Sequence, residues 1–324
     1  MMSSTISERE LAFLLYEFLD TDALLQRDRY AEHSREVFNA TLDTARKIAE
    51  DFLAPHFREG DENEPLFVHG KAQLIPPTRG AWRAIARAGF LNAHWNEAEG
   101  GLQLPEVVLR AAMSSFYAAN VSTASYPMLT IAAANLLRAF GSAELKSRYL
   151  ASMGDGRCAG TMALTEPAQG SGLADITTKA VPQADGSYRL FGQKMFISGG
   201  DQDLTENIVH MVLARIQGAP PGVRGISLFL VPKLFFIAGL LACHVRESAK
   251  FDPNHGHPQS LDHVEGAHSG VRHTHCQLWC FGVIDHLALT RSGGNQTGQE
   301  GLGELLMIRS SHGVHLSIFG LAPG

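Results

Sequence analysis

The sequence has few cysteines, no dense basic run and no sign of a leader peptide. Four cysteines in 324 residues are too few for a disulfide framework. The net charge of −6 argues against a nucleic-acid-binding surface. The first residues lack a basic segment followed by an apolar core, so they do not resemble a signal peptide. The apolar stretch 234–243 is too short to span a membrane. These absences, with 45% hydrophobic residues, predict a globular cytoplasmic enzyme.

Apolar residues at helical spacing predict an all-α bundle over residues 1–155. Ser7 and Glu10 fit a capping box, in which each side chain satisfies a free donor at the start of a helix. The first expected apolar stripe consists of Leu11, Leu14, Leu15 and Phe18. A helix over residues 35–53 should face inward through Leu42, Ala45, Ile48, Ala49 and Phe52. Further helices are expected over residues 77–88 (ended by Gly89), 106–119, 128–140 and 143–152, with loops at 59–65 and 96–105.

After residue 155 the pattern changes to short β-prone runs. They cover residues 158–166, 176–182, 187–197, 207–216 and 225–231, and they predict a small antiparallel barrel or sandwich. Asp185-Gly186 is a strong hairpin signal. Pro167 should end the first strand, and the small residues 170–172 should form a loop with exposed backbone amides. The predicted fold class is α+β, with a helical domain over 1–155, a β-domain over 156–233 and a tail over 234–324.

Two stretches of the β-domain carry a resemblance. Residues 162–171, Met-Ala-Leu-Thr-Glu-Pro-Ala-Gln-Gly-Ser, are similar to the first flavin-binding signature of the acyl-CoA dehydrogenases. Residues 192–200, Gly-Gln-Lys-Met-Phe-Ile-Ser-Gly-Gly, resemble the second signature, about thirty residues later. The resemblance covers residues 7–233, and the segment before residue 233 is similar to the larger bacterial branch, which includes enzymes for sulfur-containing acyl-CoAs. On the residues alone, the first stretch is equally well interpreted as an ordinary turn, and its aliphatic residues as core.

The resemblance implies FAD-dependent α,β-dehydrogenation of an acyl-CoA thioester, a reaction of fatty acid metabolism. In the family a carboxylate removes the α-proton while the β-hydrogen leaves as hydride to the flavin. Phe196 would cover the flavin ring if it faced outward, and Ser171 is also implied at the acyl-CoA. The resemblance further implies a homo-oligomer and an electron-transferring flavoprotein as the electron acceptor. The implied cofactor-binding residues are Met162, Leu164, Thr165, Gly170, Ser171, Phe196, Ile197 and Ser198.

The chain departs from the family pattern in two places. Gly172 stands where the family commonly has Asp, which removes a carboxylate that could fix the loop. The resemblance ends at Lys233, whereas the family continues into a second helical domain that carries its catalytic Glu. The tail glutamates, Glu247, Glu265, Glu300 and Glu304, do not match that context. We therefore assign the catalytic base to no residue, and we expect no dehydrogenation from this chain alone.

The tail has an unusual composition. It holds ten of the fifteen histidines and three of the four cysteines, but a single lysine, Lys250. The possible zinc ligands are His255, His257, His273, His275, Cys276 and Cys280. They lack the paired spacing of structural zinc sites, so no metal site is predicted.

The abrupt change after Lys233 favours a frameshift, with the C-terminal helical domain missing, and translation of the other two reading frames tests this. The alternatives are a non-catalytic remnant of such an enzyme and a metal-binding protein that uses the tail.

Overall fold

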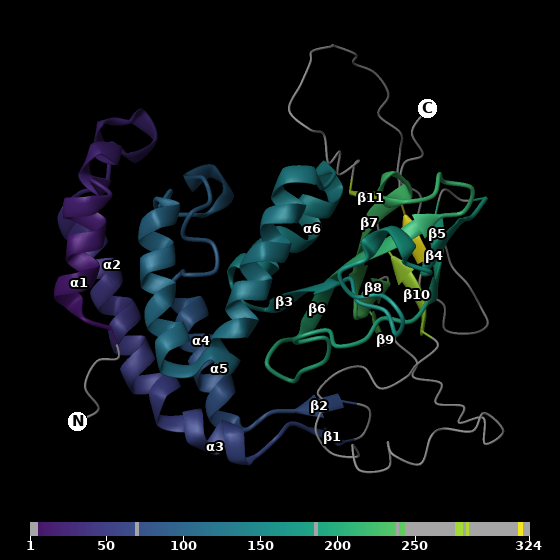
Figure 1. Ribbon diagram of the computed structural model, residues 1–324, viewed down its shortest axis with the longest axis horizontal. Coiled ribbons are helices and arrows are strands. Elements are labelled where there is room, and N and C mark those ends of the chain that lie inside the picture. The colour runs from purple at the N-terminus through teal and green to yellow at the C-terminus, as the bar shows by residue number, and fades with distance from the viewer. Residues whose placement is uncertain are drawn as a thin grey trace. The chain divides into compact units, whose positions relative to one another are not determined.

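The computed structural model describes residues 6–68, 71–184, 187–237, 240–243, 276–280, 283–284 and 317–319 (Figure 1). These residues form two compact units. The helical unit comprises the described residues up to Ala132, with Ala151–Ala159 and Gln202–Glu206. The sheet unit comprises Ala133–Leu150, Gly160–Asp201 and the described residues from Asn207 onward. The tail histidines considered as zinc ligands lie outside the described residues, and of the tail only residues 234–237, 240–243, 276–280, 283–284 and 317–319 are described, so the frameshift stays a hypothesis.

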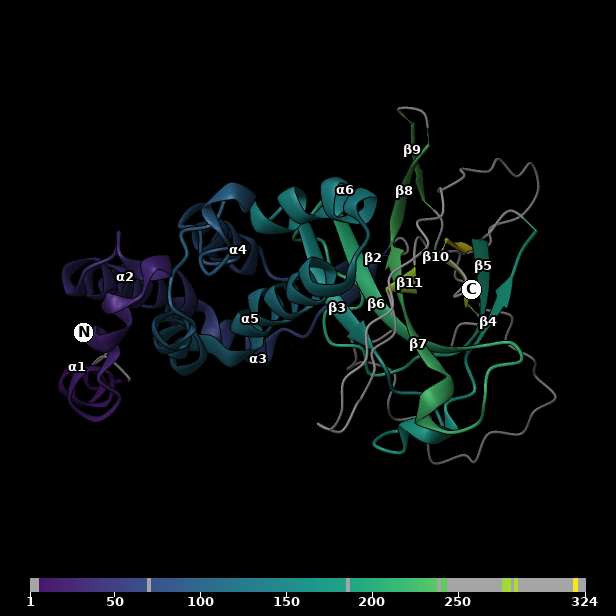
Figure 2. The ribbon, with the colours of Figure 1, turned by 90° about the horizontal axis from the view of Figure 1, so that it is seen from above.

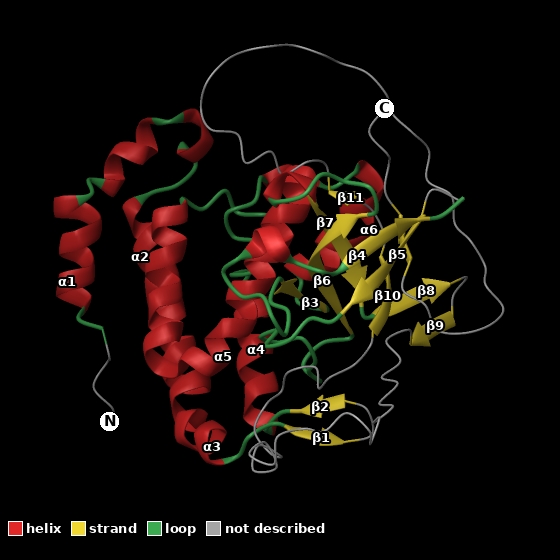
Figure 3. Ribbon diagram, turned by 45° about the vertical axis from the view of Figure 1, so that its right-hand side comes forward, coloured by secondary structure: helices red, strands yellow, loops and turns green. Residues whose placement is uncertain are grey.

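The described helices confirm most of the helical prediction (Figure 3). Ser7 and Ser34 begin the first two, since each hydroxyl accepts a hydrogen bond from the backbone amide three residues later, at 3.3 Å. Gly89, with φ of 77°, follows the fourth helix as expected. The fifth is continuous except for a kink at Asn120, whose side chain accepts a hydrogen bond from the amide of Thr123. The α-helices are α1 Glu8–Ala12, α2 Arg35–Ile48, α3 Phe57–Glu62, α4 Pro76–Arg87, α5 Glu106–Phe140 and α6 Ala143–Gly154.

Two π-helical segments correct the predicted inward faces. Phe13–Phe18 follows α1, and Ala49–Leu53 follows α2. A π-helix hydrogen-bonds i to i+5, so each turn holds an extra residue and the apolar face rotates. Leu53 is therefore fully buried, whereas Phe52, which was expected to face inward, is 44% exposed.

The stripe expected in the first helix is wrong for the same reason. Leu15 is buried, but Leu14 and Phe18 are exposed.

The helical unit also contains strands, so the prediction of an all-α region was wrong. β1 (Leu66–Val68) and β2 (Lys71–Gln73) form an antiparallel hairpin, and α3 occupies part of the segment expected to be a loop. Each strand has three residues, and Leu66 and Phe67 are exposed. Strands this short show no alternation over several residues, which is the signal from which a strand is predicted.

The sheet unit is built around β6 and β7, which pair antiparallel over seven residues (Figure 2). β6 has the bounds predicted for it, because its long apolar run is typical of a buried strand. The main sheet has the order β10-β5-β4-β6-β7-β11, with β3 beside β6 and β12 beside β5, while β8 and β9 form a separate hairpin. The strands are β3 Cys158–Ala163, β4 Lys179–Pro182, β5 Ser187–Gly192, β6 Asn207–Ile216, β7 Ile226–Pro232, β8 Leu234–Ile237, β9 Leu240–Cys243, β10 Cys276–Cys280, β11 Val283–Ile284 and β12 Ser317–Phe319.

The sheet is mixed, which corrects the predicted antiparallel arrangement. β4 and β5 pair antiparallel as the hairpin signal indicated, although the turn at 185–186 lies outside the described residues. β4 and β6, however, are parallel. The connection over residues 193–206 is long enough for the chain to return past β5 and run beside β4 in the same direction.

Candidate functional site

The two motif segments of the sheet unit are held together by direct contacts. We call residues 162–171 the first segment and residues 192–200 the second segment. The first leaves the end of β3, and the second begins at the end of β5. The backbone amide of Met195 donates a hydrogen bond to the carbonyl of Thr165 at 3.0 Å. The Lys194 ammonium donates to the carbonyl of Leu164 at 2.9 Å.

Glu166 is the centre of this arrangement. Its carboxylate accepts the backbone amide and hydroxyl of Thr177 at 2.6 and 2.7 Å, and those of Thr178 at 3.0 and 2.6 Å. Lys194 completes the set with an ion pair at 2.9 Å. The side chain of Glu166 is 1% exposed and that of Lys194 is 6% exposed. One carboxylate thus joins the first segment, the start of β4 and the second segment.

These contacts explain the ionisation of the pair. Burial raises the pKa of Glu166, but the hydrogen bonds from Thr178, Thr177 and Lys194 outweigh it and bring the pKa to about 2. Burial lowers the pKa of Lys194, and the neighbouring carboxylate of Glu166 opposes that shift. Since five donors surround the carboxylate, the pair is charged at neutral pH.

Gly192 is required by the same cluster. A Cβ atom at this position would lie 2.5 Å from Oγ1 and 2.7 Å from Cα of Thr178. Thr178 cannot move away without giving up its bonds to Glu166. Gly192, the first residue of the second segment, therefore leaves space for Thr178, which hydrogen-bonds to Glu166 of the first segment.

The structure places the predicted site residues in two groups. Met162, Leu164 and Thr165 are half-buried beside the clamped backbone, and Ile197 is buried. The others are exposed, and these are Gly170, Ser171, Phe196 and Ser198. The sequence left the direction of Phe196 open, and the structure exposes it; Ile197, which the resemblance implies as a flavin contact, is buried.

Phe196 has an unusual backbone. Its φ is 56°, in the left-handed region that non-glycine residues rarely adopt, and the residue is 66% exposed. Strain of this kind persists where the surroundings fix the chain, and it is frequent at ligand sites. Here the amide of Met195 and the ammonium of Lys194 fix the residues just before it.

The exposed groups suit a flavin. An aromatic ring at Phe196 can cover a planar ring system, and the hydroxyls of Ser171 and Ser198 can donate to or accept from ring heteroatoms and phosphates. At Gly170 nothing lies within 4 Å of the position that a Cβ atom would occupy, so the backbone leaves room for close approach of a ligand. The Gly172 loop is anchored from behind, since Arg215 donates to the carbonyl of Ala174 at 2.8 Å.

Sequence reasoning missed the residues that hold the site together, namely Glu166, Lys194, Thr177 and Thr178 as a cluster. The available signal was an acidic residue at the end of a buried strand and a lysine within the second motif. A sequence pattern does not show that these two side chains meet. The tail glutamates considered as bases lie outside the described residues.

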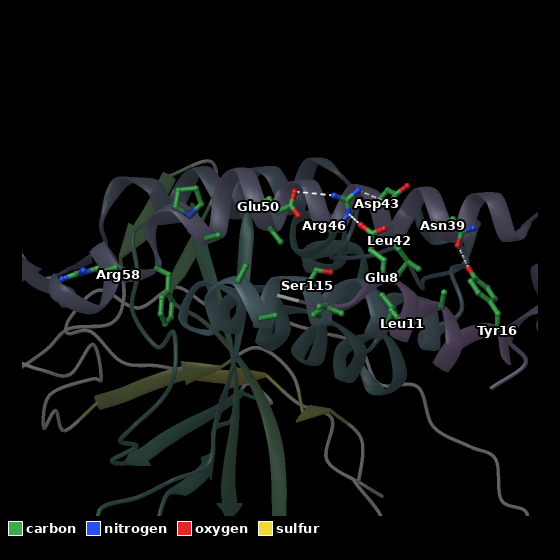
Figure 4. Close-up of a pocket in the computed structure, with 18 residues that line it drawn as sticks. Glu8, Leu11, Tyr16, Asn39, Leu42, Asp43, Arg46, Glu50, Arg58 and Ser115 are labelled. Carbon is green, nitrogen blue, oxygen red and sulfur yellow. Dashed lines mark hydrogen bonds and ion pairs between the residues drawn. The ribbon is translucent and has the colours of Figure 1, made fainter. Parts of the chain in front are cut away.

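The helical unit contains a hollow with a different chemistry, of about 1100 Å³ (Figure 4). Leu11, Leu42 and small residues line it. One cation, Arg46, lies among three carboxylates. Its guanidinium nitrogens are 3.1 Å from a carboxylate oxygen of Glu8, 3.4 Å from one of Asp43 and 3.5 Å from one of Glu50. Because three carboxylates surround one guanidinium, this part of the hollow carries an excess of negative charge, which disfavours an anionic cofactor.

The described residues offer neither a metal-ligand cluster nor a helix suited to a bilayer. They contain no group of three or more His, Cys, Asp or Glu residues placed to hold a metal ion. Within the same residues, no helix combines the length and the apolar character needed to cross a bilayer.

Comparison with known proteins agrees with the motif positions. The acyl-CoA dehydrogenase N-terminal domain matches residues 36–157, and the acyl-CoA dehydrogenase middle domain matches residues 161–239. The chain is 36% identical over 226 residues to 3-methylmercaptopropionyl-CoA dehydrogenase of Ruegeria pomeroyi, which is 70% of this chain and 38% of that protein. A butyryl-CoA dehydrogenase of Syntrophomonas wolfei aligns at 28% identity over 97% of this chain and 50% of its own length.

Solved structures show the same fold. A structure described as the electron-transferring flavoprotein of Acidaminococcus fermentans superposes with a TM-score of 0.51 at 28% identity, covering 64% of this chain and 51% of that one. The chain spans about 38% of the length of the first curated relatives. The two butyryl-CoA dehydrogenases of Syntrophomonas wolfei align over 232 and 321 residues of sequence. In the longer alignment, similarity to the family therefore extends past Lys233, where the resemblance was expected to end.

Proposed function

This chain belongs to the acyl-CoA dehydrogenase family, and we propose that it binds FAD through the first and second segments and serves the α,β-dehydrogenation of an acyl-CoA thioester. The observation that carries the proposal is the direct clamp between these segments by Glu166 and Lys194, which leaves Phe196 and Ser198 exposed beside it. FAD, when bound, would accept the hydride that leaves the β-carbon.

The chain's own residues would bind and orient. The backbone at Leu164 and Thr165 is fixed by the second segment, so any donor or acceptor it offers to the flavin is pre-positioned. Phe196 would shield one face of the ring from water, and Ser198 would bond to its edge. Ser171, in an exposed loop, would contact the acyl-CoA.

We assign further properties to the same function. The electron acceptor would be an electron-transferring flavoprotein, and the solved structure from Acidaminococcus fermentans supports a link to such proteins. The role would be in fatty acid metabolism in the cytoplasm, and a homo-oligomer is implied only by resemblance to the family. The division into a domain over 1–155 and a domain over 156–233 is part of this proposal.

Flavin titration of the purified full chain tests the proposal. FAD should bind, give a visible absorbance band and lose fluorescence on binding. Phe196→Ala and Ser198→Ala should each weaken binding about tenfold, because each removes one contact worth roughly 1–1.5 kcal/mol. Ser147→Ala, at an exposed hydroxyl of α6, is the matched control and should leave FAD affinity unchanged. Absence of any FAD binding would contradict the proposal.

A further inference from the structure

The cluster around Glu166 does not contact the exposed face on which the flavin is proposed to lie. Its carboxylate and the Lys194 ammonium are buried, while Phe196 and Ser198 are exposed. The two buried side chains are therefore not placed to contact a flavin that lies against Phe196 and Ser198. Lys194 contacts the backbone of the first segment at the carbonyl of Leu164, and the next residue, Met195, donates its amide to Thr165.

Burying two charges is unfavourable unless they pair with each other and their remaining hydrogen-bonding groups are satisfied. Here both oxygens of Glu166 are satisfied, one by Thr177 and the other by Thr178 and Lys194. Lys194 also donates to the carbonyl of Leu164, so its position is fixed from two sides. Because every hydrogen-bonding group of the carboxylate is satisfied, the pair favours one arrangement of the chain. Any shift of one segment against the other would leave a buried charge without a partner.

We propose that Glu166 and Lys194 are positioning residues that lock the first and second segments into one flavin-binding geometry. This inference rests on the proposed function. The lock acts through the Met195–Thr165 backbone bond and sets the left-handed turn at Phe196. Removing either charge releases the second segment from the first, and the exposed aromatic ring loses its fixed place.

The test uses the full chain, with Glu166→Gln, Lys194→Met and the double variant. The first readout is hydrogen exchange at the amide of Met195 in flavin-free protein. This amide bonds to Thr165 and to neither member of the pair, so it reports the lock indirectly. Exchange should become at least tenfold faster in each single variant. The second readout is FAD titration, in which each single variant should bind at least tenfold more weakly.

Lys233→Met is the matched control. Lys233 is also a largely buried lysine of the sheet unit, and it pairs with Asp201 beyond the second segment. Its loss should lower overall stability without faster exchange at Met195 or weaker FAD binding beyond twofold. Equal effects in this control and in Lys194→Met would overturn the proposal, because the pair would then contribute only general stability.

The double variant Glu166→Gln with Lys194→Met separates a lock from an unpaired charge. It leaves no lone buried charge, so its FAD affinity should be higher than the product of the two single losses predicts. Additive losses would overturn the assignment of the two residues as one unit. If the unchanged protein binds no FAD, the proposed function fails, and exchange at Met195 still decides whether the pair joins the segments.

Discussion

The Arg46 cluster of the helical unit and the Glu166–Lys194 pair of the sheet unit place charged groups in opposite environments. In the helical unit Arg46 lies near three carboxylates, and all four side chains are 31% to 70% exposed. In the sheet unit Glu166 and Lys194 form a pair that is nearly inaccessible to water. Solvent screens the first set, so each of its contacts contributes little. The second set is desolvated, so its contacts are strong and the loss of one partner is costly.

The difference follows from what each unit must position. The helical unit is stabilised by close-packed apolar side chains such as Phe38, Leu53 and Phe116, none of which needs a polar partner to set its direction. The sheet unit must hold two loops beside one another. Loops have no repeating backbone pattern, so a buried ion pair with directional hydrogen bonds specifies their arrangement where apolar packing would allow several.

The largest expected effect comes from breaking the buried pair. Lys194→Met leaves Glu166 without its charged partner in a desolvated site, which should cost about 3–5 kcal/mol of unfolding free energy. Arg46→Met in the helical unit is the matched change, and it should cost less than about 1 kcal/mol because its partners remain hydrated. Urea unfolding followed by tryptophan fluorescence and circular dichroism compares the two. Equal losses would contradict the contrast between the units.

Acid should weaken the sheet unit through Glu166. Its pKa is about 2 in the folded protein, against a reference value of 4.5, so the unfolded chain binds the proton more readily. The stabilisation is present above pH 4.5 and is lost as pH falls toward 2, and it amounts to roughly 3 kcal/mol. Glu166→Gln should remove this part of the pH dependence.

One buried histidine in each unit should lower the stability of the protein at a higher pH than Glu166 does. Burial lowers the pKa of His210 in the sheet unit to about 4 and lowers that of His56 in the helical unit. The unfolded chain therefore takes up protons first, and stability should fall as pH drops below 6.5. Unfolding midpoints measured from about pH 8 to about pH 3 should show this decline before the loss due to Glu166. A flat midpoint between pH 6.5 and pH 4.5 would contradict the sign.

Alanine at two glycine positions, Gly192 and Gly80, should change the stability of the protein in opposite directions. Gly192→Ala forces a Cβ against Thr178, and overpacking of this kind typically costs about 1–3 kcal/mol. At Gly80, inside α4, no atom lies within 4 Å of a Cβ, so alanine should stabilise the helix by about 0.5–1 kcal/mol. Thermal unfolding of both variants tests the pair. A neutral Gly192→Ala would show that Thr178 can shift without loss of its bond to Glu166.

What could be predicted from the sequence depended on how far the determining interactions lay along the chain. β6 was predicted with its observed bounds because a continuous apolar run is a local signal. The helix ending at Gly89 was predicted because a left-handed glycine is also local. Phe52 was placed on the wrong face because a π-helical turn leaves no mark in the apolar spacing. The helix bend at Asn120 depends on its bond to the carbonyl of Leu53, 67 residues away.

The candidate site shows the same limit. Its two segments could be found from their motifs, but the direction of Phe196 could not, because this residue lies between β5 and β6 and follows no strand alternation. The contact between Glu166 and Lys194 could not, because it joins residues 28 apart through a mixed sheet whose parallel β4–β6 pair was not predicted. Because charged residues are mostly exposed, the sequence around Glu166 or Lys194 alone gives no reason to expect either to be buried.

The smallest expected effect concerns the loop at Gly172, which begins a helical turn without a side-chain cap. Gly172 precedes the 3₁₀ turn Leu173–Asp175 and offers no side chain to its free amides, whereas Ser7 and Ser34 cap α1 and α2 in the helical unit. Gly172→Asp adds a carboxylate at this position, where the nearest atoms to a Cβ are 3.6 and 3.8 Å away, so the change fits without strain. An acidic cap in place of glycine typically gains a few tenths of a kcal/mol, and Asp175 nearby reduces that gain by repulsion.

Unfolding of Gly172→Asp should therefore differ from the unchanged protein by less than about 0.5 kcal/mol. FAD affinity should rise about twofold, because a capped turn holds Ser171 more firmly, and Ser34→Ala should lose about 1 kcal/mol without any change in FAD affinity. These two variants separate loop order at the site from helix stability elsewhere. Weaker FAD binding by Gly172→Asp would mean that the added negative charge faces the flavin phosphates, and the loop would then have to lie against the anionic part of the cofactor.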